Sequence, residues 1–334
     1  MQQFLLDILN TSKSRDDINT LFLNADMEWE NFVHTASSYL LLPAVYYRLK
    51  TLKLTSILPA DLDNYLENFC SINYNRNVKL LDEARAVSCV LNENNIPHVF
   101  IKGIALLACN IYDSPGSRMI GDIDLLVKRP DIPKAMAVLK DFGYSKQIGF
   151  AYKNIGFRHE DRLVDKEKLA AVEIHNNILN APHQNLIDPD DLFENSILES
   201  GLPVPNSTHN CMIQVLTYQI NDKGYFFNRI YPKSLFDVHC LNIPKNTEAL
   251  NILHKTKFGK AYLELYVYCM EGRHPKNKSL RLKFFILKQR YKFIDRLSHT
   301  VKYIYNQIID RLYQFRKNPY YRKHTLKKVL KPRS

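Results

Sequence analysis

The chain has few cysteines and no cysteine motif. Its 334 residues include six cysteines, which are widely spaced and form no Cys-x-x-Cys pair. They are Cys70, Cys89, Cys109, Cys211, Cys240 and Cys269. Without a secretory signal, this pattern predicts reduced and mostly buried thiols instead of an extracellular disulfide framework. We therefore expect a cytoplasmic protein.

Long apolar runs are also absent. No stretch approaches the roughly 18 uncharged apolar residues that a membrane-spanning helix requires. Residues 1–10, MQQFLLDILN, contain Asp7 within their apolar run and no basic segment before it, so they do not predict a signal peptide. The sequence thus predicts no transmembrane segment.

Acidic residues are scarce in one part of the chain only. The net charge is +12, but residues 273–334 hold 19 Lys and Arg and only two acids, Asp295 and Asp310. The remainder holds 27 basic and 32 acidic residues, so the positive charge belongs to the C-terminal part. This distribution argues against a nucleic-acid platform on the rest of the chain.

The apolar content is ordinary for a globular protein, and the length allows two domains or one large core with helical additions. Short β-branched runs alternate with helical patterns in the middle of the chain, and helical spacing prevails on both sides. The predicted fold class is α+β, with a small mixed β-sheet core between N- and C-terminal helical regions. The predicted parts are a helical region over 1–95, the core over 96–185, a helical domain over 186–272, and a basic amphipathic helix and tail over 273–334.

The order of predicted elements follows the same patterns. In the core, we expect strands over 98–102 and 122–128, helices over 104–112 and 132–141, a short strand after Tyr144, and a β pair near 157–164 and 169–175. Outside the core, we expect helices over residues 1–75, one long helix or two helices over 61–91, helices after residue 180, one long helix over 280–315 and a flexible basic extension after Pro319.

Two aspartates in the predicted strand over 122–128 are the most informative residues. Side chains of a strand alternate between faces, so Asp122 and Asp124 point the same way while the apolar residues around them fill a core. Two carboxylates on one face of a buried strand are costly unless a cation or hydrogen-bond donors satisfy them. Because Mg²⁺ prefers carboxylate oxygens, it is the expected cation.

The preceding strand ends in Lys102-Gly103 and leads into a helix. Gly103 permits close approach of a ligand to the backbone, and a helix start with a nearby Lys favours phosphate binding. Arg118 lies four residues before Asp122 and could add a guanidinium to the same phosphates. The segment therefore predicts a phosphate-binding site made by Lys102, Gly103 and Arg118.

A third acid, Glu173, lies in the alternating segment Ala-Val-Glu-Ile-His of residues 171–175. If this segment pairs beside the strand over 122–128, three carboxylates converge, which is the minimum for a two-metal phosphoryl-transfer site. His159 and His175 invite a role as general bases, but a strand histidine is more often a packed, hydrogen-bonded residue. Such a mechanism needs no histidine, because the third carboxylate or solvent can activate the acceptor.

With these motifs, the chain resembles the uncharacterised bacterial nucleotidyltransferase family of the DNA-polymerase-β-like superfamily. The resemblance rests on Lys102-Gly103, Arg118, Asp122-x-Asp124 and the Val-Glu-x-His of residues 172–175. Weaker features are the basic Phe-Arg-His of 157–159, the Leu-Leu-Pro region within 29–49 and a helical pattern over 229–241. It covers roughly residues 25–245 and is strongest over 97–180. The wider superfamily usually carries Gly-Ser where this chain and the closer family carry Lys-Gly, so the difference separates subfamilies.

The resemblance implies a nucleotidyltransferase fold that uses an NTP and two Mg²⁺ ions, and it does not supply the acceptor. Asp122, Asp124 and Glu173 would be the catalytic and metal-binding residues. The expected reaction transfers a nucleotidyl group from an NTP to a hydroxyl or phosphate acceptor and releases pyrophosphate. The alternatives are a catalytically degenerate fold that binds nucleic acid or membrane, and a toxin that modifies another macromolecule.

The basic C-terminal part has its own amphipathic pattern. Apolar residues recur every three or four positions from Ile294 to Phe315, with Lys and Arg on the other faces. Three interpretations stay open for residues 280–334. The helix could pack on the protein, lie on an anionic membrane surface so that the protein is peripheral to the membrane, or bind RNA.

Overall fold

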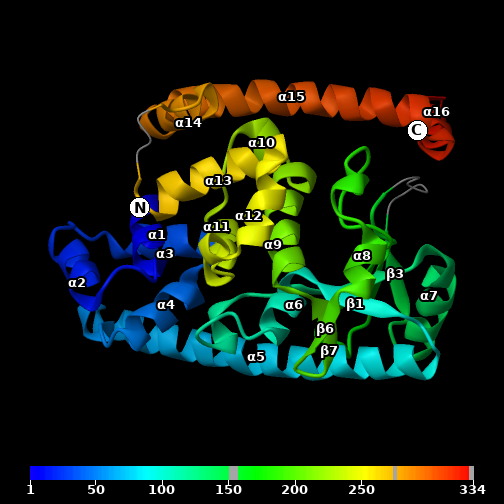
Figure 1. The fold of residues 1–334 in the computed structure, drawn as a ribbon, viewed down its shortest axis with the longest axis horizontal. Coiled ribbons are helices and arrows are strands. Elements are labelled where there is room, and N and C mark those ends of the chain that lie inside the picture. The colour runs from blue at the N-terminus through cyan, green and yellow to red at the C-terminus, as the bar shows by residue number, and fades with distance from the viewer. Residues whose placement is uncertain (150–156, 274–276, 331–334) are drawn as a thin grey trace.

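The computed structural model describes residues 1–149, 157–273 and 277–330. Figure 1 shows helices from both ends of the chain arranged around a small β-sheet. The expected α+β fold, with a mixed sheet and helical flanking regions, is therefore confirmed. Residues 274–276 and 331–334 of the predicted basic region lie outside the described residues.

The N-terminal region contains four helices that precede one long helix. They are α1 (Gln2–Leu9), α2 (Arg15–Leu23), α3 (Trp29–Ser38) and α4 (Leu42–Thr51). Ser14 and Asp17 form a capping box at the start of α2, which satisfies two backbone N–H groups. The apolar faces of these helices meet in a cluster that also receives Leu106 and Phe236, so the region packs on the rest of the chain.

Helix α5 (Ala60–Glu93) spans 34 residues, so the segment over 61–91 forms one long helix and not two. Its first half contributes Leu66 and Cys70 to the N-terminal cluster. Its second half contributes Leu80 and Leu91 to the cluster beneath the sheet. Figure 1 shows the helix running along the lower edge of the molecule, where it supports both regions.

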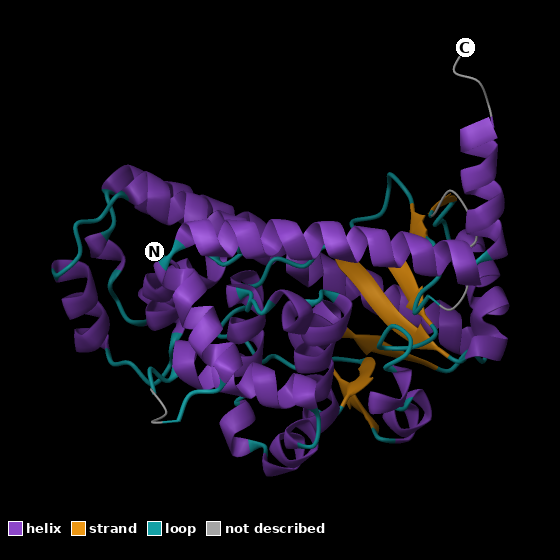
Figure 2. Ribbon diagram, turned by 90° about the horizontal axis from the view of Figure 1, so that it is seen from above, coloured by secondary structure: helices purple, strands orange, loops and turns teal. Residues whose placement is uncertain are grey.

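The sheet has five strands in the order β1-β2-β5-β4-β3. The strands are β1 (His98–Ile101), β2 (Asp122–Val127), β3 (Lys146–Ile148), β4 (Arg162–Val164) and β5 (Ala171–His175). Strands β2 and β5 are parallel, whereas the pairs β1–β2, β4–β5 and β3–β4 are antiparallel. The pairing of β5 beside β2, on which the predicted site depends, is therefore present. Figure 2 shows the strands from above, behind the helix that crosses the molecule.

Two helices connect the strands. Helix α7 (Ile132–Asp141) has the predicted bounds, whereas α6 (Lys102–Ala108) starts and ends earlier than the expected helix over 104–112. The chain turns into α6 at Lys102, which has a left-handed φ of 57°. After α6, Asn110 has a φ of 50°, a conformation that commonly closes a helix at its C-terminal end. These two residues set the length of α6.

A second, two-stranded sheet corrects the expectation that only helices follow residue 180. Strands β6 (Ser196–Glu199) and β7 (Leu202–Pro205) form an antiparallel hairpin. Ser200 and Gly201 have φ values of 52° and 81°, and a two-residue type I′ hairpin turn requires a positive φ at both positions. Leu202 and Val204 join the apolar cluster beneath the main sheet, which explains why this segment is extended.

The C-terminal helical region covers the other face of the main sheet. Its helices are α8 (Pro189–Glu194), α9 (Ser207–Leu216), α10 (Gly224–Phe227), α11 (Pro232–Cys240), α12 (Thr247–His254) and α13 (Lys257–Met270). A π-helical turn over Thr217–Asn221 continues α9. These helices share an apolar cluster with Val99, Ile101 and Leu126 of the sheet.

The basic C-terminal part consists of α14 (Leu280–Arg290), α15 (Lys292–Lys317) and α16 (Pro319–Leu330). The single helix expected over 280–315 is broken at Tyr291, whose backbone is extended. The expectation of a flexible extension after Pro319 is wrong for residues 319–330, which are helical. The Asn318 side chain accepts hydrogen bonds from the backbone N–H groups of Tyr320 and Tyr321 and so caps α16. Among the helices of the described ranges, none is long and apolar enough to cross a membrane.

Candidate functional site

The alternation of side chains along β2 directs its two aspartates towards the C-terminal helices. Ile123 and Leu125 pack in the cluster that α5 and α7 share with the sheet, whereas Leu126 belongs to the cluster of the C-terminal helices. Because side chains alternate along a strand, Asp122 and Asp124 lie on the same face as Leu126. The two acids therefore face the junction between the sheet and the helical region.

Glu173 reaches the same face from β5. The two parallel strands place Asp124 opposite Glu173 and Asp122 opposite Ala171. Asp124 is 8% exposed and Glu173 is 6% exposed, so both acids are buried. The two paired strands therefore bring Asp124 and Glu173 side by side, and Asp122 lies on the same face of β2, next to Asp124.

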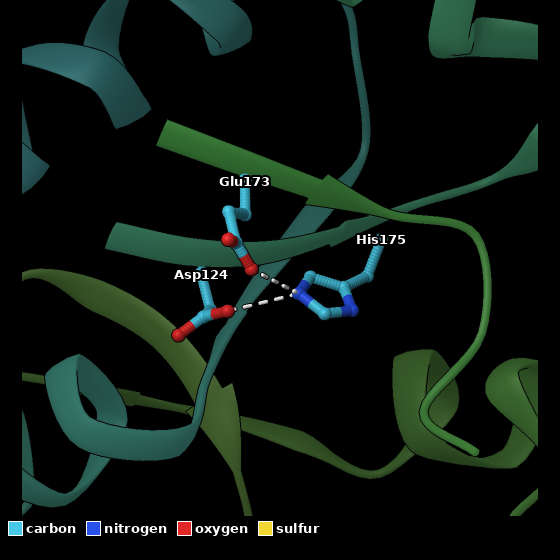
Figure 3. Close-up of side chains that lie close together, drawn as sticks. All are labelled: Asp124, Glu173 and His175. Carbon is cyan, nitrogen blue, oxygen red and sulfur yellow. Dashed lines mark hydrogen bonds and ion pairs between the residues drawn. The ribbon is translucent and has the colours of Figure 1, made fainter. Parts of the chain in front are cut away.

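His175, at the end of β5, lies beside the two buried acids (Figure 3). Its Nε2 is 2.9 Å from Asp124 Oδ1 and 3.6 Å from Glu173 Oε2. One ligand atom from each residue lies within 4.8 Å of the others, a spacing that one metal ion can span. The Nδ1 atom of His175 is buried without a hydrogen-bond partner among the described residues. The packed, hydrogen-bonded role predicted for His175 agrees with its bond to Asp124.

Lys102 supplies the cation closest to Asp124. Its left-handed backbone turns the chain between β1 and α6, and its Nζ lies 2.5 Å from Asp124 Oδ1. The same Nζ is 3.3 Å from Nε2 of His175. Lys102 and Gly103 both line the cleft in front of the acids. The Lys102 side chain therefore pairs with a carboxylate and also lines the cleft.

Arg162 on β4 joins the other two acids, and no motif in the sequence identifies it. Its Nη2 donates to Asp122 Oδ2 at 2.7 Å, and its Nε donates to Glu173 Oε1. The bond to Glu173 raises the pKa of Arg162 above its ordinary value, although partial burial opposes this. Burial raises the pKa of Asp122, and the nearby Arg162 guanidinium offsets this rise only in part. The residue was missed because its partners lie on other strands.

The buried acids are held in their ionised forms. Burial alone would favour the protonated form of Asp124, but the Lys102 ammonium and His175 outweigh it and hold the pKa well below its usual range. Burial likewise opposes ionisation of Glu173, yet hydrogen bonds from His175 and Arg162 lower its pKa to about 2. Both carboxylates are therefore available as oxygen ligands at neutral pH.

One turn of α5 fixes the loop that leads into β2. The Asn73 amide donates to the carbonyl oxygens of Gly116 at 2.7 Å and of Arg118 at 3.2 Å. The Asn77 amide donates to the carbonyls of Pro115 and Arg118 at 2.7 and 2.6 Å. Both asparagines are buried, so these bonds replace the water that the loop carbonyls would otherwise need. The long helix thus positions the residues just before Asp122.

A cleft of about 310 Å³ lies in front of the acids, between the sheet and the C-terminal helices. The start of α6 and the loop into β2 form one side, while the π-helical turn and α11 form the other. The lining residues are Lys102, Gly103, Arg118, Met119, Ile120, Gly121, Asp122, Asp124, Arg158, Gln214, Thr217, Tyr218, Asn221, Asp222, Tyr231, Lys233, Ser234 and Asp237. The cleft therefore includes five of the six residues that the sequence selects, and Glu173 is not among its lining residues.

Arg158 and Lys233 bring further positive charge to the cleft. Burial lowers the pKa of Arg158, and nearby acids oppose that effect. Burial lowers the pKa of Lys233 to about 8, with Arg118 adding to the effect and Asp237 opposing it. Arg158 belongs to the basic stretch that the sequence resemblance includes. No local sequence pattern marks Lys233 as a site residue, because it reaches the cleft from α11, far along the chain.

Arg118 has a different position from the one expected for a free phosphate ligand. Its Nε and Nη2 donate to Oδ1 and Oδ2 of Asp237 at 2.8 and 3.0 Å, and its Nη1 donates to the Met119 carbonyl. Tyr112 donates a further hydrogen bond to Asp237 Oδ1 at 2.8 Å. The two charged side chains of the ion pair are 7% and 3% exposed. Arg118 therefore connects the loop before β2 with α11 while it lines the cleft.

His159 packs against the site without entering the cluster of acids. It forms a β-bridge with His175, and the two rings are 5.1 Å apart. Its Nδ1 lies 2.7 Å from the carbonyl oxygen of Glu160, and burial lowers the pKa of its ring. These contacts agree with the predicted packed role of His159.

The sequence of the chain matches a known protein family. No protein of curated function matches the chain. The family described as uncharacterised nucleotidyltransferase matches residues 25–253, well over half of the chain. That range contains the Asp124–Glu173–His175 cluster and all the residues that line the cleft. The chain therefore belongs to the family of uncharacterised nucleotidyltransferases.

Proposed function

We propose that this protein is a Mg²⁺-dependent enzyme that transfers a nucleotidyl group from an NTP to a hydroxyl or phosphate acceptor and releases pyrophosphate. One observation carries the proposal: ionised acids from two paired strands converge beside a cleft lined by lysines and arginines. A triphosphate needs cations along its length, and its transfer needs carboxylates that hold metal ions. The family match supports the general class of transferase.

The acids fit the proposed metal ions by their chemistry. Asp122, Asp124 and Glu173 offer carboxylate oxygens, which are the ligands that Mg²⁺ prefers. His175 holds the Asp124 carboxylate in place by a 2.9 Å bond, as an outer partner of a metal ligand commonly does. Bound Mg²⁺ would neutralise charge on the phosphate oxygens and lower the pKa of the acceptor. We assign the metal-binding role to the three carboxylates and the orienting role to His175.

The cations of the cleft have the task of binding the triphosphate. Lys102 lies beside the acids, whereas Lys233 and Arg158 reach the cleft from other segments. The backbone at Gly103 permits a phosphate oxygen to approach closely, because glycine has no side chain to exclude it. In the proposed enzyme, these groups hold the nucleotide so that its α-phosphorus faces the acceptor. The cleft thus contributes mainly position and charge neutralisation.

The transfer step requires one bond to form and one to break. An oxygen of the acceptor attacks the α-phosphorus, and the bond to the bridging oxygen of the pyrophosphate breaks. The acceptor proton passes to a Glu173 carboxylate oxygen or to solvent. Because its hydrogen bonds hold the pKa of Glu173 well below the ordinary value, Glu173 is a weak base. Glu173 therefore contributes as a metal ligand first.

Asp124→Asn tests the proposal, since it retains the size of the side chain and removes one charge. The wild-type protein should bind at least one of ATP, GTP, CTP or UTP with Mg²⁺ in calorimetry. Once an acceptor is identified, the substitution should lower pyrophosphate release roughly 100- to 1,000-fold. The matched control is Asp26→Asn, an exposed loop residue, which should retain binding and turnover.

Two results would overturn the proposed activity. One is a folded wild-type protein that shows no heat with any of the four Mg²⁺–nucleotides. The other is nucleotide turnover that survives in Asp124→Asn. Thermal unfolding of both variants would show that each is folded before either result is interpreted.

A further inference from the structure

Helix α15 presents an apolar stripe to the outside of the molecule. Its apolar residues follow spacings of four, four and three, which keeps them on one face along the helix. The outer stripe consists of Phe293, Leu297, Val301, Ile304, Ile308, Leu312 and Phe315. Each of these side chains is between 40% and 74% exposed, and none of the residues of α15 is buried. The stripe is therefore unpartnered within the described parts of the chain.

The opposite face of α15, which is polar, is the one that contacts the protein. The inner stripe consists of Asp295, His299, Lys302, Asn306 and Asp310. Asp295 accepts from Arg229 at 2.6 Å, and Lys223 donates to Asn306 and Asp310 at 2.8 and 2.6 Å. Lys302 donates to the Phe226 carbonyl at 2.7 Å, and the His299 ring lies 5.0 Å from the Phe227 ring. A surface helix normally buries its apolar face and exposes its polar face, so α15 is oriented in the reverse sense.

The charge on this part of the surface has one sign. Residues 273–334 contain two acids, Asp295 and Asp310, and both are held on the inner stripe by ion pairs. Arg296, Arg311 and Arg316 of α15 are exposed and have no acid beside them on their own helix face. Helix α16 adds more Lys and Arg beyond the end of α15. The outer stripe therefore lies within a cationic surface.

We propose that the outer face of α15 lies on an anionic lipid bilayer. An aliphatic stripe flanked by Lys and Arg is the pattern by which a helix enters the boundary between headgroups and acyl chains. RNA is less well matched, because single strands are bound through aromatic stacking and cations, and most of this stripe is aliphatic. A second copy of the chain would bring two cationic surfaces together, which charge repulsion opposes.

The position of α15 in the fold allows such contact. Figure 1 shows α15 along the upper edge of the ribbon, on the side opposite α5, and Figure 2 shows it crossing the face nearest the viewer. A flat surface could therefore meet the helix along its length. The polar inner stripe holds the helix on the protein while the apolar stripe is free to enter the bilayer.

Vesicle co-sedimentation of the full-length protein tests this proposal. The probes are vesicles of phosphatidylcholine alone and vesicles of equal parts phosphatidylcholine and phosphatidylglycerol. We expect the protein to sediment with the anionic vesicles and to stay in solution with the neutral ones. Added salt should weaken the binding, because it screens the attraction between the arginines and the lipids.

A matched pair of triple variants separates the outer stripe from general hydrophobicity. Leu297→Gln/Ile304→Gln/Leu312→Gln should lower affinity for the anionic vesicles roughly 100-fold, since three apolar side chains leave the bilayer boundary. Leu23→Gln/Ile72→Gln/Leu198→Gln makes the same changes at exposed residues on α2, α5 and β6 and should leave vesicle binding unchanged. All six positions are exposed, so both proteins should fold.

Three outcomes would overturn the proposal. Equal loss of vesicle binding in the two triple variants would remove the specific role of the outer stripe. RNA binding by a wild-type protein that ignores anionic vesicles would assign the surface to nucleic acid. A dimer that the α15 variant converts to a monomer, again without vesicle binding, would assign the outer stripe to a second copy.

Discussion

Among single residues, Lys233 has the clearest measurable consequence. Its ammonium lies in the proposed nucleotide cleft, where burial and the Arg118 guanidinium lower its pKa to about 8. The carboxylates of Asp237 and Asp222 limit that effect, and Lys102 adds to it. Lys233 is therefore charged below about pH 8 and loses its charge as the pH rises past that value.

This titration predicts a pH profile for the proposed enzyme. Because kcat/KM reports the ionisation of the free enzyme, its value for the NTP should fall as the pH rises through about 8, by roughly tenfold or more. Lys233→Arg keeps a cation at every accessible pH and should remove the fall. Steady-state rates measured across pH for both proteins check this. An identical fall in the arginine variant would assign the titration to another group.

The sequence identifies candidate site residues where a local pattern marks them and misses those defined by distant partners. Asp122, Asp124 and Glu173 are recognisable because alternation in a strand places charge where a core is expected. Arg162 and Lys233 are ordinary surface-type residues in their own segments. Their importance arises from the strands and helices that fold next to them, which no local spacing encodes.

At the level of elements, α5 acts on the site through the loop it holds. Asn73 is 7% exposed, and its amide donates hydrogen bonds to the carbonyls of Gly116 and Arg118. A buried carbonyl without a donor costs about 1–3 kcal/mol. The helix therefore contributes to the position of the loop before β2 as well as to the apolar core.

Asn73→Ala should lower the free energy of unfolding by about 2 kcal/mol, because the Gly116 carbonyl loses its donor. The control is Asn68→Ala on the same helix, where the exposed amide donates to the Asn64 carbonyl one turn earlier. That change should alter stability by less than about 0.5 kcal/mol. Urea unfolding of the three proteins measures the difference. Equal stability of the two variants would show that the loop carbonyls do not depend on α5.

The elements themselves were predictable in proportion to their regularity. The bounds of α7 and most of α5 follow from helical periodicity and their end signals. The hairpin of β6 and β7 was missed, although Ser200-Gly201 is a recognisable two-residue turn, because its strands are short and contain two prolines. The helix after Pro319 was missed because its basic composition outweighed the Asn-Pro start signal.

In the whole molecule, the Arg118–Asp237 ion pair joins the sheet core to the C-terminal helical region. Its members are 119 residues apart in the chain and lie on opposite sides of the cleft. Two buried charges are stable together because each satisfies the other, whereas one alone is costly. The pair therefore fixes how the two regions meet at the site.

Removal of one side chain of this ion pair should destabilise the protein more than removal of both. Arg118→Met leaves the Asp237 carboxylate buried without its cation and should lower the free energy of unfolding by about 3 kcal/mol. Arg118→Met/Asp237→Leu should recover much of that loss, since no buried charge remains. Urea unfolding of the wild type, both single variants and the double variant gives the coupling. An additive result would mean that the two side chains act independently.

The large-scale organisation was predictable in outline. The uneven charge and the alternating central segment indicated a basic C-terminal part and a mixed sheet between helical regions, and the structure has both. The contact between Arg118 and Asp237 was not predictable, because it depends on how two regions pack. The inverted orientation of α15 was also hidden, since a helical stripe in a sequence does not say which face meets the protein.

The pairing of Lys102 and Arg162 with the three acids has a consequence for how the protein folds. These two side chains serve as internal counterions, so the sheet can assemble without a bound metal ion. Small metal-dependent domains behave differently, because they stay unfolded until their ion binds. Here, folding of the chain and binding of the metal would be separate events. Removal of Mg²⁺ would stop the proposed reaction but leave the protein folded.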